Sequence, residues 1–357
     1  MSDDIADTRH GSFLGAEDLL GRAAAAERRV RAATAAAAQD FSVPEAFRLD
    51  EATRSGMTAL LEEWVEAAER ALSDFATPGA GEVLPLLRAA GLLNDWTLTD
   101  ALIGQVRQDQ LGKALPHHAS ADPARVSLIN RFIDHPVPAI AEAARDLLLA
   151  GHHKGNPETG QQRAPLHLHA KLLWWVASAK REQAGAEADI ALDEALCAAV
   201  RRAIAAAEAF PNEAADAAAM RFAAAIGSAP REVPELLVEA LRDRRLALFL
   251  ALFAHAAQIG YADARALVLD RHPQRLVLAL HAIGAPRDTI AQIGFLLCEA
   301  DPNRAIAVLA DCVDAVGAVD HAQAWAVLAA LRLDPAYHAA RAALRRSAMA
   351  GWGEGGR

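Results

Sequence analysis

Apolar residues recur every three or four positions along most of the chain, which is the spacing of a helix with one buried face. Residues 50–75 show this spacing most clearly in the N-terminal half. We expect further helices at 16–39, 84–90, 98–115, 166–183, 189–209 and 213–226. The stretch Leu246–Leu250 has the length of a strand, but its alanine content and the surrounding helical period argue against one. The pattern therefore predicts an all-α protein.

The segment from Ala121 to Gly151 predicts two antiparallel helices joined by a tight turn. We expect Asp122 to cap the first helix and Pro123 to occupy its first turn. That helix should end near Phe132, and Gly151 should end the second. A pair of this kind is the building unit of HEAT-like proteins.

The C-terminal half shows a weak recurrence of proline after a polar residue, each time at the expected start of a helix. Helices are expected there at 234–241, 245–259, 262–269, 273–283, 288–299, 302–316, 321–331 and 335–346. The recurring prolines are Pro273, Pro302 and Pro335, at spacings of 29 and 33 residues. A period near 30 is typical of a two-helix repeat whose copies must stack to bury their apolar faces. We expect stacked antiparallel helix pairs in a HEAT-like α-solenoid; two packed helical bundles are the alternative.

Residues 151–165 form the clearest linker, since they combine glycine, proline and polar residues without an apolar period. We therefore expect an N-terminal helical domain over 1–150, which contains the pair at 121–151. A C-terminal helical-repeat domain should follow over 166–348, and residues 349–357 should form a flexible tail.

Composition narrows the class of protein. The chain has 357 residues, of which 53% are hydrophobic and 5% aromatic, so its core must be built largely from small side chains. The net charge of −10 and the lack of a basic face argue against a nucleic-acid partner. Short arginine clusters, such as the one that contains Arg244 and Arg245, are expected on solvated helix faces; contact with phosphate or RNA is the alternative.

Cysteine content and apolar runs bear on the compartment. The three cysteines form no CxxC motif, which fits a reducing environment. The N-terminus has no signal-peptide core, and the apolar run Leu246–Ala257 is too short to span a bilayer and is expected to be a buried core helix. We expect a soluble, cytoplasmic protein without a membrane partner.

Familiar catalytic motifs are absent from the sequence, including GxxxxGK[ST], GxSxG and HExxH. Histidine is the one residue type that clusters. Seven of the thirteen histidines are His117, His118, His135, His152, His153, His167 and His169. Zinc needs three or four converging ligands, and neighbouring histidines on a regular backbone diverge. We interpret these as solvated side chains and expect no metal and no cofactor; adventitious metal binding and a genuine site are the alternatives.

The stretch 166–183 carries the strongest candidate for an interaction surface. On a helix, Leu168, Leu172, Trp175 and Ala179 share one apolar stripe, and His167, Lys171, Trp174, Ser178 and Arg181 form its polar neighbour. Trp174 then lies at the edge of burial, where it stacks on Lys171 or meets a neighbouring helix or a partner. The interaction candidates are Trp174, Lys171, Arg181, Arg244 and Arg245.

Several stretches together resemble a known family. "LLGRAAAAERRVRAATAAAAQDF", "RLDEATRSGMTALLEEWVEAAERAL" and "RAAGLLNDWTLTDALIGQVRQDQLGKAL" are similar to the N-terminal part of an alphaproteobacterial family of helical-repeat proteins of unknown function. "LHLHAKLLWWVASAKRE" and residues 236–333 resemble its members from sphingomonad-type bacteria. The resemblance implies an all-helical, HEAT-like fold and a cytoplasmic bacterial protein. It carries no catalytic or binding residue over to this chain.

Three hypotheses for function follow. The first is a non-enzymatic scaffold or adaptor that binds another protein, with a basic partner slightly favoured by the acidic balance. The second is a small-molecule or signal sensor, in which the helices of 166–259 enclose the ligand and Trp174 or Trp175 covers it. The third is a metal-dependent enzyme that uses the histidine cluster. The pattern leaves the oligomeric state open.

Overall fold

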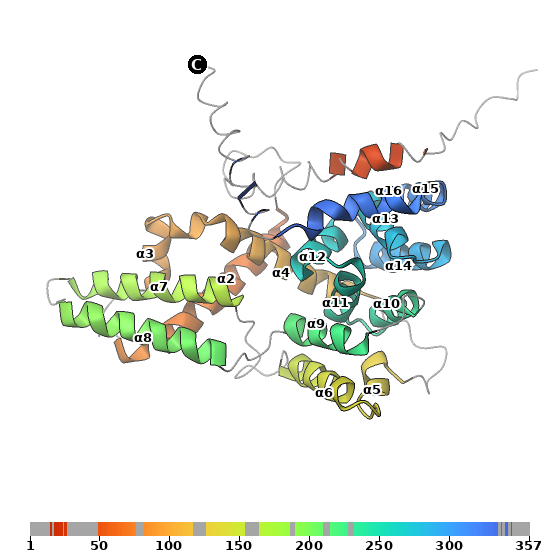
Figure 1. The fold of residues 1–357 in the computed structure, drawn as a ribbon. Coiled ribbons are helices and arrows are strands. Elements are labelled where there is room, and N and C mark those ends of the chain that lie inside the picture. The colour runs from red at the N-terminus through yellow and green to blue at the C-terminus, as the bar shows by residue number, and fades with distance from the viewer. Residues whose placement is uncertain are drawn as a thin grey trace, which may run out of the picture. The chain divides into compact units, whose positions relative to one another are not determined.

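The regular elements of the protein are helices, as the sequence predicts (Figure 1). The computed structural model describes residues 15, 18–23, 25, 26, 49–75, 82–116, 126–153, 164–185, 190–209, 215–227, 232–334, 337, 340, 341 and 344, and none of these lies in a strand. The all-α class is therefore confirmed. The chain forms two compact units, one of residues 31–113 and 122–227 and the other of residues 1–30, 114–121 and 228–357.

The first unit, called here the α2–α9 unit, is built around helix α7. Helix α7 packs against α2, α3 and α8, while α6 packs against α5 and α9. The elements are α2 (Glu51–Ala71), η2 (Ser73–Phe75), α3 (Val83–Ala89), η3 (Leu92–Asn94), α4 (Trp96–Ala114), α5 (Leu128–Phe132), α6 (Pro138–His153), α7 (Leu166–Gln183), α8 (Ile190–Ala209) and α9 (Ala215–Ile226).

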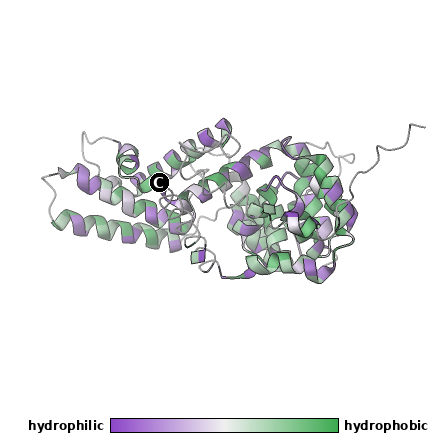
Figure 2. Ribbon diagram, turned by 90° about the horizontal axis from the view of Figure 1, so that it is seen from above, coloured by the Kyte–Doolittle hydropathy of each residue, from purple (hydrophilic) through white to green (hydrophobic). Residues whose placement is uncertain are grey.

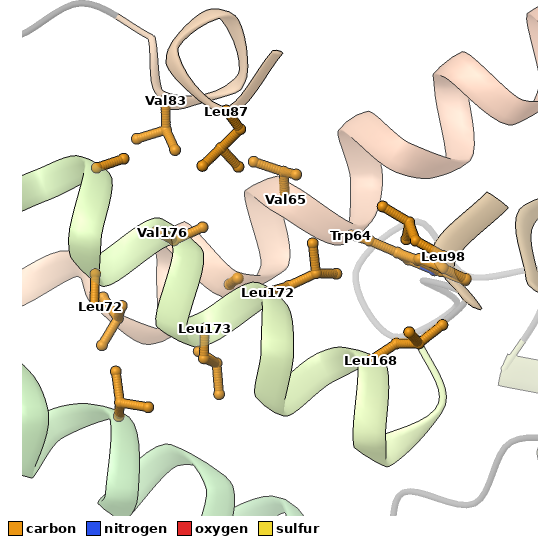
Figure 3. Close-up of a cluster of buried hydrophobic side chains, with 14 of the residues drawn as sticks. Trp64, Val65, Leu72, Val83, Leu87, Leu98, Leu168, Leu172, Leu173 and Val176 are labelled. Carbon is orange, nitrogen blue, oxygen red and sulfur yellow. The ribbon is translucent and has the colours of Figure 1, made fainter. Parts of the chain in front are cut away.

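The core of this unit forms where the apolar stripes of α2, α3, α4 and α7 meet (Figure 3). Helix α2 begins after Asp50, whose carboxylate accepts a hydrogen bond from the Thr53 N–H at 2.8 Å. Its apolar face then turns Trp64 and Val65 inward, as the spacing predicts. A β-carbon on Gly56 would lie 2.7 Å from Val106 Cγ1, so glycine lets α2 approach α4 closely.

The expected linker does not separate the helices of this unit. Helix α6 precedes residues 154–163, which lie outside the described residues, and α7 and α9 follow them, yet α6 packs against α9. Gly151 was expected to end a helix but lies inside α6, which continues to His153. The first helix of that pair, α5, begins only at Leu128 with Ser127 as its N-cap, so the expected start with Asp122 as cap and Pro123 in the first turn is wrong; residues 122 and 123 themselves lie outside the described residues.

The second unit, called the α10–α16 unit, pairs successive helices. Contacts join α10 with α11, α11 with α12, α14 with α15, and α13 with α14, α15 and α16. Residues 18–23 are also helical in this unit. Its further elements are α10 (Val233–Arg242), α11 (Leu246–Ala257), α12 (Tyr261–Leu269), α13 (Gln274–Ala282), α14 (Arg287–Ala300), α15 (Ile306–Val316), α16 (His321–Ala329) and η5 (Ala330–Arg332).

Helix α11 is the buried core helix that its apolar run predicts, with Phe249 and Phe253 fully covered. In Figure 2, hydrophobic and hydrophilic residues alternate around the helices, which is the amphipathic pattern of packed helices. Within the described part of the chain, no single helix has the length and apolarity of a membrane span. Helices α11 and α12 meet these criteria only as a pair, and the pair is bent by 114° at its break.

Two of the recurring prolines, Pro273 and Pro302, lie at turns that begin with an aspartate and contact each other. Asp270 follows α12 and Asp301 follows α14, and each carboxylate accepts a hydrogen bond at 3.0 Å from the N–H two residues on. Arg271 Nε donates to Asp301 Oδ2 at 3.3 Å, which joins the two turns. Recurrence in the sequence thus corresponds here to two similar turns in contact, whereas a repeat over the whole unit stays a prediction.

The prolines that follow these aspartates differ in position. Pro273 is the N-cap of α13, as expected. Pro302 instead lies in a turn, because α15 begins only at Ile306; the expected helix start at Pro302 is wrong. The physical reason is Arg304, whose guanidinium reaches back to the carbonyl oxygens of Val268 and Asp270 and so holds residues 301–304 in a turn. Pro335 lies outside the described residues.

Candidate functional site

The outer face of α7 presents Trp174 to solvent. This side chain is 38% exposed, whereas Leu168 and Leu172 on the neighbouring stripe are buried. Trp175 was expected in the core and is only partly buried against it. The two adjacent tryptophans therefore separate as the helical period predicts, and Trp174 remains a candidate for contact with a partner.

Lys171 is held by the start of α4. Its Nζ lies 2.9 Å from Asp95 Oδ2 and 3.3 Å from Thr97 Oγ1. It also lies 5.7 Å from the ring of Trp175, so the expected stacking on Trp174 is wrong. At 100° per residue, a residue four positions on differs in direction by about 40° and one three positions on by about 60°, so Lys171 points closer to Trp175 than to Trp174.

The charges around Lys171 affect two titratable groups. Burial alone would raise the pKa of Asp95, but hydrogen bonds from Thr97, Lys171 and the Leu98 N–H, together with the charge of Lys171, lower it overall. Burial and the charge of Lys171 lower the pKa of His167, against a smaller opposite effect of Asp95. The polar face of α7 at this point is thus tied to α4.

Arg181, like Lys171, forms an ion pair that joins α7 to another element. Its Nε donates to Asp193 Oδ1 at 2.5 Å and so links α7 to α8. Both side chains are about one-third exposed. An ion pair of this kind contributes little to stability, but it orients the guanidinium towards a neighbouring helix. Of the three candidates on α7, Lys171 and Arg181 therefore have internal roles that the sequence did not reveal.

Arg244 and Arg245 lie in the turn between α10 and α11, half-buried, and not on a solvated helix face as expected. Arg244 has a φ of 57°, and its N–H donates to Leu241 O at 2.9 Å. The Arg245 N–H donates to Ala240 O at 2.8 Å. Burial lowers the pKa of Arg245, partly offset by Asp243. These contacts close the C-terminal end of α10.

Of the seven clustered histidines, His135, His167 and His169 are the ones whose side chains the structure describes. Among the described residues, no group of three or more histidine, cysteine, aspartate or glutamate side chains is arranged to hold a metal ion. His152 and His153 are the last two residues of α6. His117 and His118 lie outside the described residues.

A groove along α14 and α15 is the feature that the sequence analysis missed. It has a volume of about 570 Å³. Two large apolar side chains on its walls are exposed to solvent, Phe295 by 46% and Ile306 by 54%, while Leu309 and Val313 are buried beneath. The signal was present in the sequence: at 100° per residue, Phe295 lies on roughly the opposite side of α14 from Ile290, Ile293 and Leu297.

Charged residues lie at the edge of this groove. Arg287 of α14 forms an ion pair with Asp314 of α15, and Asp288 is exposed beside them. Because the pair joins the first turn of α14 to the last turns of α15, it marks one end of the groove. The apolar walls, the buried floor and the polar end together give the arrangement of a protein-binding surface, with an apolar centre and a polar rim.

A second, enclosed cavity lies deeper between α13, α14 and α15. Its volume is about 10 Å³, which is room for about one water molecule and far less than a small-molecule ligand needs. Arg304 and Cys298 contribute to its lining. Burial raises the pKa of Cys298, against the charge of Arg304, so this thiol is not activated as a nucleophile.

Buried polar side chains lie in and beside the two joined turns, and Arg304 is the one of them that also lines that cavity. Asp270, Gln274, Arg275 and Arg304 are all at least nine-tenths buried. Arg304 donates to Val268 O at 2.6 Å and to Asp270 O at 3.1 Å. Burial raises the pKa of Asp270, although the His272 N–H and the charges of His272, Arg275 and Arg304 oppose this. The cluster fastens the turns to each other and has a structural role.

No family model, curated protein or solved structure matches the chain. The resemblance to an alphaproteobacterial helical-repeat family therefore stays a prediction.

Proposed function

We propose that the protein is a non-enzymatic, cytoplasmic helical scaffold or adaptor that binds another protein in the groove along α14 and α15. The observation that carries the proposal is the pair of exposed apolar side chains, Phe295 and Ile306, on the walls of that groove. Large apolar side chains grouped over a buried apolar floor gain free energy when a partner covers them. An aromatic anchor in a central pocket is typical of residues that dominate binding.

The dimensions of the groove favour a macromolecule over a small ligand. Helix α14 has 14 residues and α15 has 11. At about 1.5 Å per residue these lengths are roughly 21 and 16 Å. The groove is therefore about three helical turns long and open along its side, whereas small-molecule sites enclose most of the ligand. The sensor and metalloenzyme hypotheses stay predictions without a specific structural observation in their favour.

Affinity capture with a matched pair of variants tests the proposal. The protein and the Phe295→Ser/Ile306→Ser variant are each used to recover binding partners from the cells that make the protein. The control is Leu149→Ser/Ile190→Ser, which removes two side chains of the α2–α9 unit that are 57% and 72% exposed. We expect a partner that is retained by the wild type and the control and lost with the groove variant. A partner profile that is identical for all three proteins would contradict the proposal.

A further inference from the structure

We propose that the occupant of the groove is an amphipathic helix of another protein, about three turns long, with basic residues beside its apolar stripe. This inference rests on the proposed function and specifies the partner. It uses the shape of the groove, the hydrogen-bonding needs of the occupant, and the charge of α14 and α15.

The spacing of the groove's apolar side chains matches a helix. Ile306 and Val313 are seven residues apart on α15, which places them about 10 Å apart along the helix axis. Phe295 lies on the facing wall, on α14. A docked helix presents apolar side chains at positions i, i+3 or i+4, and i+7, which cover the same length. Three side chains of the partner can therefore enter between Phe295, Ile306 and Val313.

An extended peptide would fit this surface poorly. Apart from Gln292 and the charged residues Arg287, Asp288 and Asp314, the residues that line the groove are apolar: Ala291, Phe295, Ile306, Leu309, Ala310 and Val313. Backbone N–H and C=O groups of an extended segment would lose water there without gaining partners. A helix satisfies these groups internally, so it can enter an apolar groove without that cost.

The charge of the two helices favours a basic partner. Their sequences contain four acidic residues, Asp288, Glu299, Asp311 and Asp314, and one basic residue, Arg287. Arg287 already forms an ion pair with Asp314, so its charge is compensated. Asp288 is then the acidic residue of the groove edge whose charge that pair does not compensate, and lysine or arginine beside the apolar stripe of a partner would be attracted to it. A second copy of this chain would bring the same acidic surface, and like charges would oppose its docking here.

Synthetic peptides of 14 residues provide the probe. All carry the same leucines at positions i, i+4 and i+7, and the first two also carry a side-chain crosslink that holds the helix. One carries lysine and arginine beside the stripe, a second carries glutamate there, and a third is the basic peptide without the crosslink and with proline at its centre. Fluorescence anisotropy measures the Kd of each for the full-length protein at low and high salt.

At low salt, we expect the basic helix to bind at least tenfold more tightly than the acidic helix or the proline peptide. At high salt, the Kd values of the basic and the acidic helix should differ less. Phe295→Ser/Ile306→Ser should weaken its binding at least tenfold, and Ile190→Ser should not change it. Ala310→Arg, which fills the groove with a basic side chain and leaves both anchors in place, should also weaken it at least tenfold. Circular dichroism and thermal melting check that the variants are folded.

The outcomes separate this inference from the proposed function. Equal or tighter binding of the acidic or the proline peptide overturns the helix proposal. A Kd of the basic helix that is unchanged in both groove variants overturns it as well. A cellular partner that depends on Phe295 and Ile306 but contacts them with an acidic or extended segment overturns the helix proposal alone. Capture of a second copy of this chain has the same effect. Absence of any groove-dependent partner overturns the proposed function itself.

Discussion

A β-carbon placed on Gly294 would lie 2.5 Å from Cδ1 and 2.7 Å from Cδ2 of Leu309. Helices α14 and α15 are therefore closer together at this point than any side chain larger than hydrogen allows. Leu309 is buried and lines both the groove and the small cavity beneath it. The contact between Gly294 and Leu309 thus sets the depth of the groove.

Gly294→Ala should destabilise the α10–α16 unit by about 1–2 kcal/mol, because overpacking outweighs the gain in helix propensity. The control is Gly21→Ala, also in a helix, where the added β-carbon meets no atom within 4 Å. That variant should be neutral or stabilised by up to about 1 kcal/mol. Urea denaturation of both variants measures the difference. Equal effects at the two glycines would show that Leu309 moves aside freely.

Two aspartates should respond to pH with opposite signs. The pKa of Asp95 is lowered from 3.8 on folding, so its stabilising contribution is present above that value and is lost as the pH falls through the lowered pKa. Asp95→Asn should then destabilise the α2–α9 unit at pH 7 by at most about 1 kcal/mol, since its pair with Lys171 is partly exposed. The difference from the wild type should shrink below pH 4.

Asp270 shows the reverse. Its pKa is raised from 3.8, so its contribution favours folding at low pH and is lost as the pH rises through the raised pKa. Asp270→Asn should therefore stabilise the α10–α16 unit at pH 7, and the gain should disappear towards pH 4. Hydrogen exchange, corrected for the intrinsic pH dependence of the rates, follows each unit separately. The same sign for both variants would contradict the burial argument for Asp270.

Arg304 should be much more important to stability than Arg271. Arg304→Met keeps the apolar stem but leaves the buried carbonyls of Val268 and Asp270 without their donors, at a cost of about 2–4 kcal/mol. Arg271→Ala removes only a largely exposed partner of Asp301 and should cost less than about 1 kcal/mol. Thermal unfolding distinguishes the two; similar losses would mean that the two turns are held mainly by Asp301.

The ends of α11 and α13 offer a test of backbone strain. Each helix is followed within two residues by one with positive φ, Gln258 at 54° after α11 and Gly284 at 81° after α13. After each, the next N–H donates back to a helix carbonyl at 3.0 Å, from Ile259 to Ala254 and from Ala285 to Leu280. Gln258→Gly should stabilise the unit by about 0.5 kcal/mol, and Gly284→Ala should destabilise it by about 1 kcal/mol. Denaturant midpoints that move in the same direction would refute this.

Local sequence patterns predicted most helices because each pattern is a property of one segment. The bounds expected for residues 166–183 coincide with α7 (Leu166–Gln183), which follows Pro165 and has a clear apolar stripe. The start of α15 was misplaced by four residues because the turn before it depends on Arg304, a contact with residues more than 30 positions away. The periodicity of a single segment likewise does not predict that α6 packs against α9, because α7 and α8 lie between them in the sequence.

The candidate site was predictable only in part. The exposure of Trp174 follows from the period of α7, but the roles of Lys171 and Arg181 depend on Asp95 and Asp193, which lie on other elements. For the groove, the isolated position of Phe295 on α14 was a usable signal. The exposure of Ile306 could not be predicted, because it depends on the residue at which α15 begins.

Site-specific photo-crosslinking at Phe295 tests most directly whether the groove binds a protein. Phe295→p-benzoylphenylalanine places the crosslinker on the wall of the groove, and Ile190→p-benzoylphenylalanine places it on an exposed apolar position of α8 as the control. After irradiation of the cells that make the protein, we predict an adduct with another protein at position 295 that is missing at position 190. Mass spectrometry should map it to a basic amphipathic segment. The same adducts at both positions, or none at 295, would contradict a groove that binds a partner.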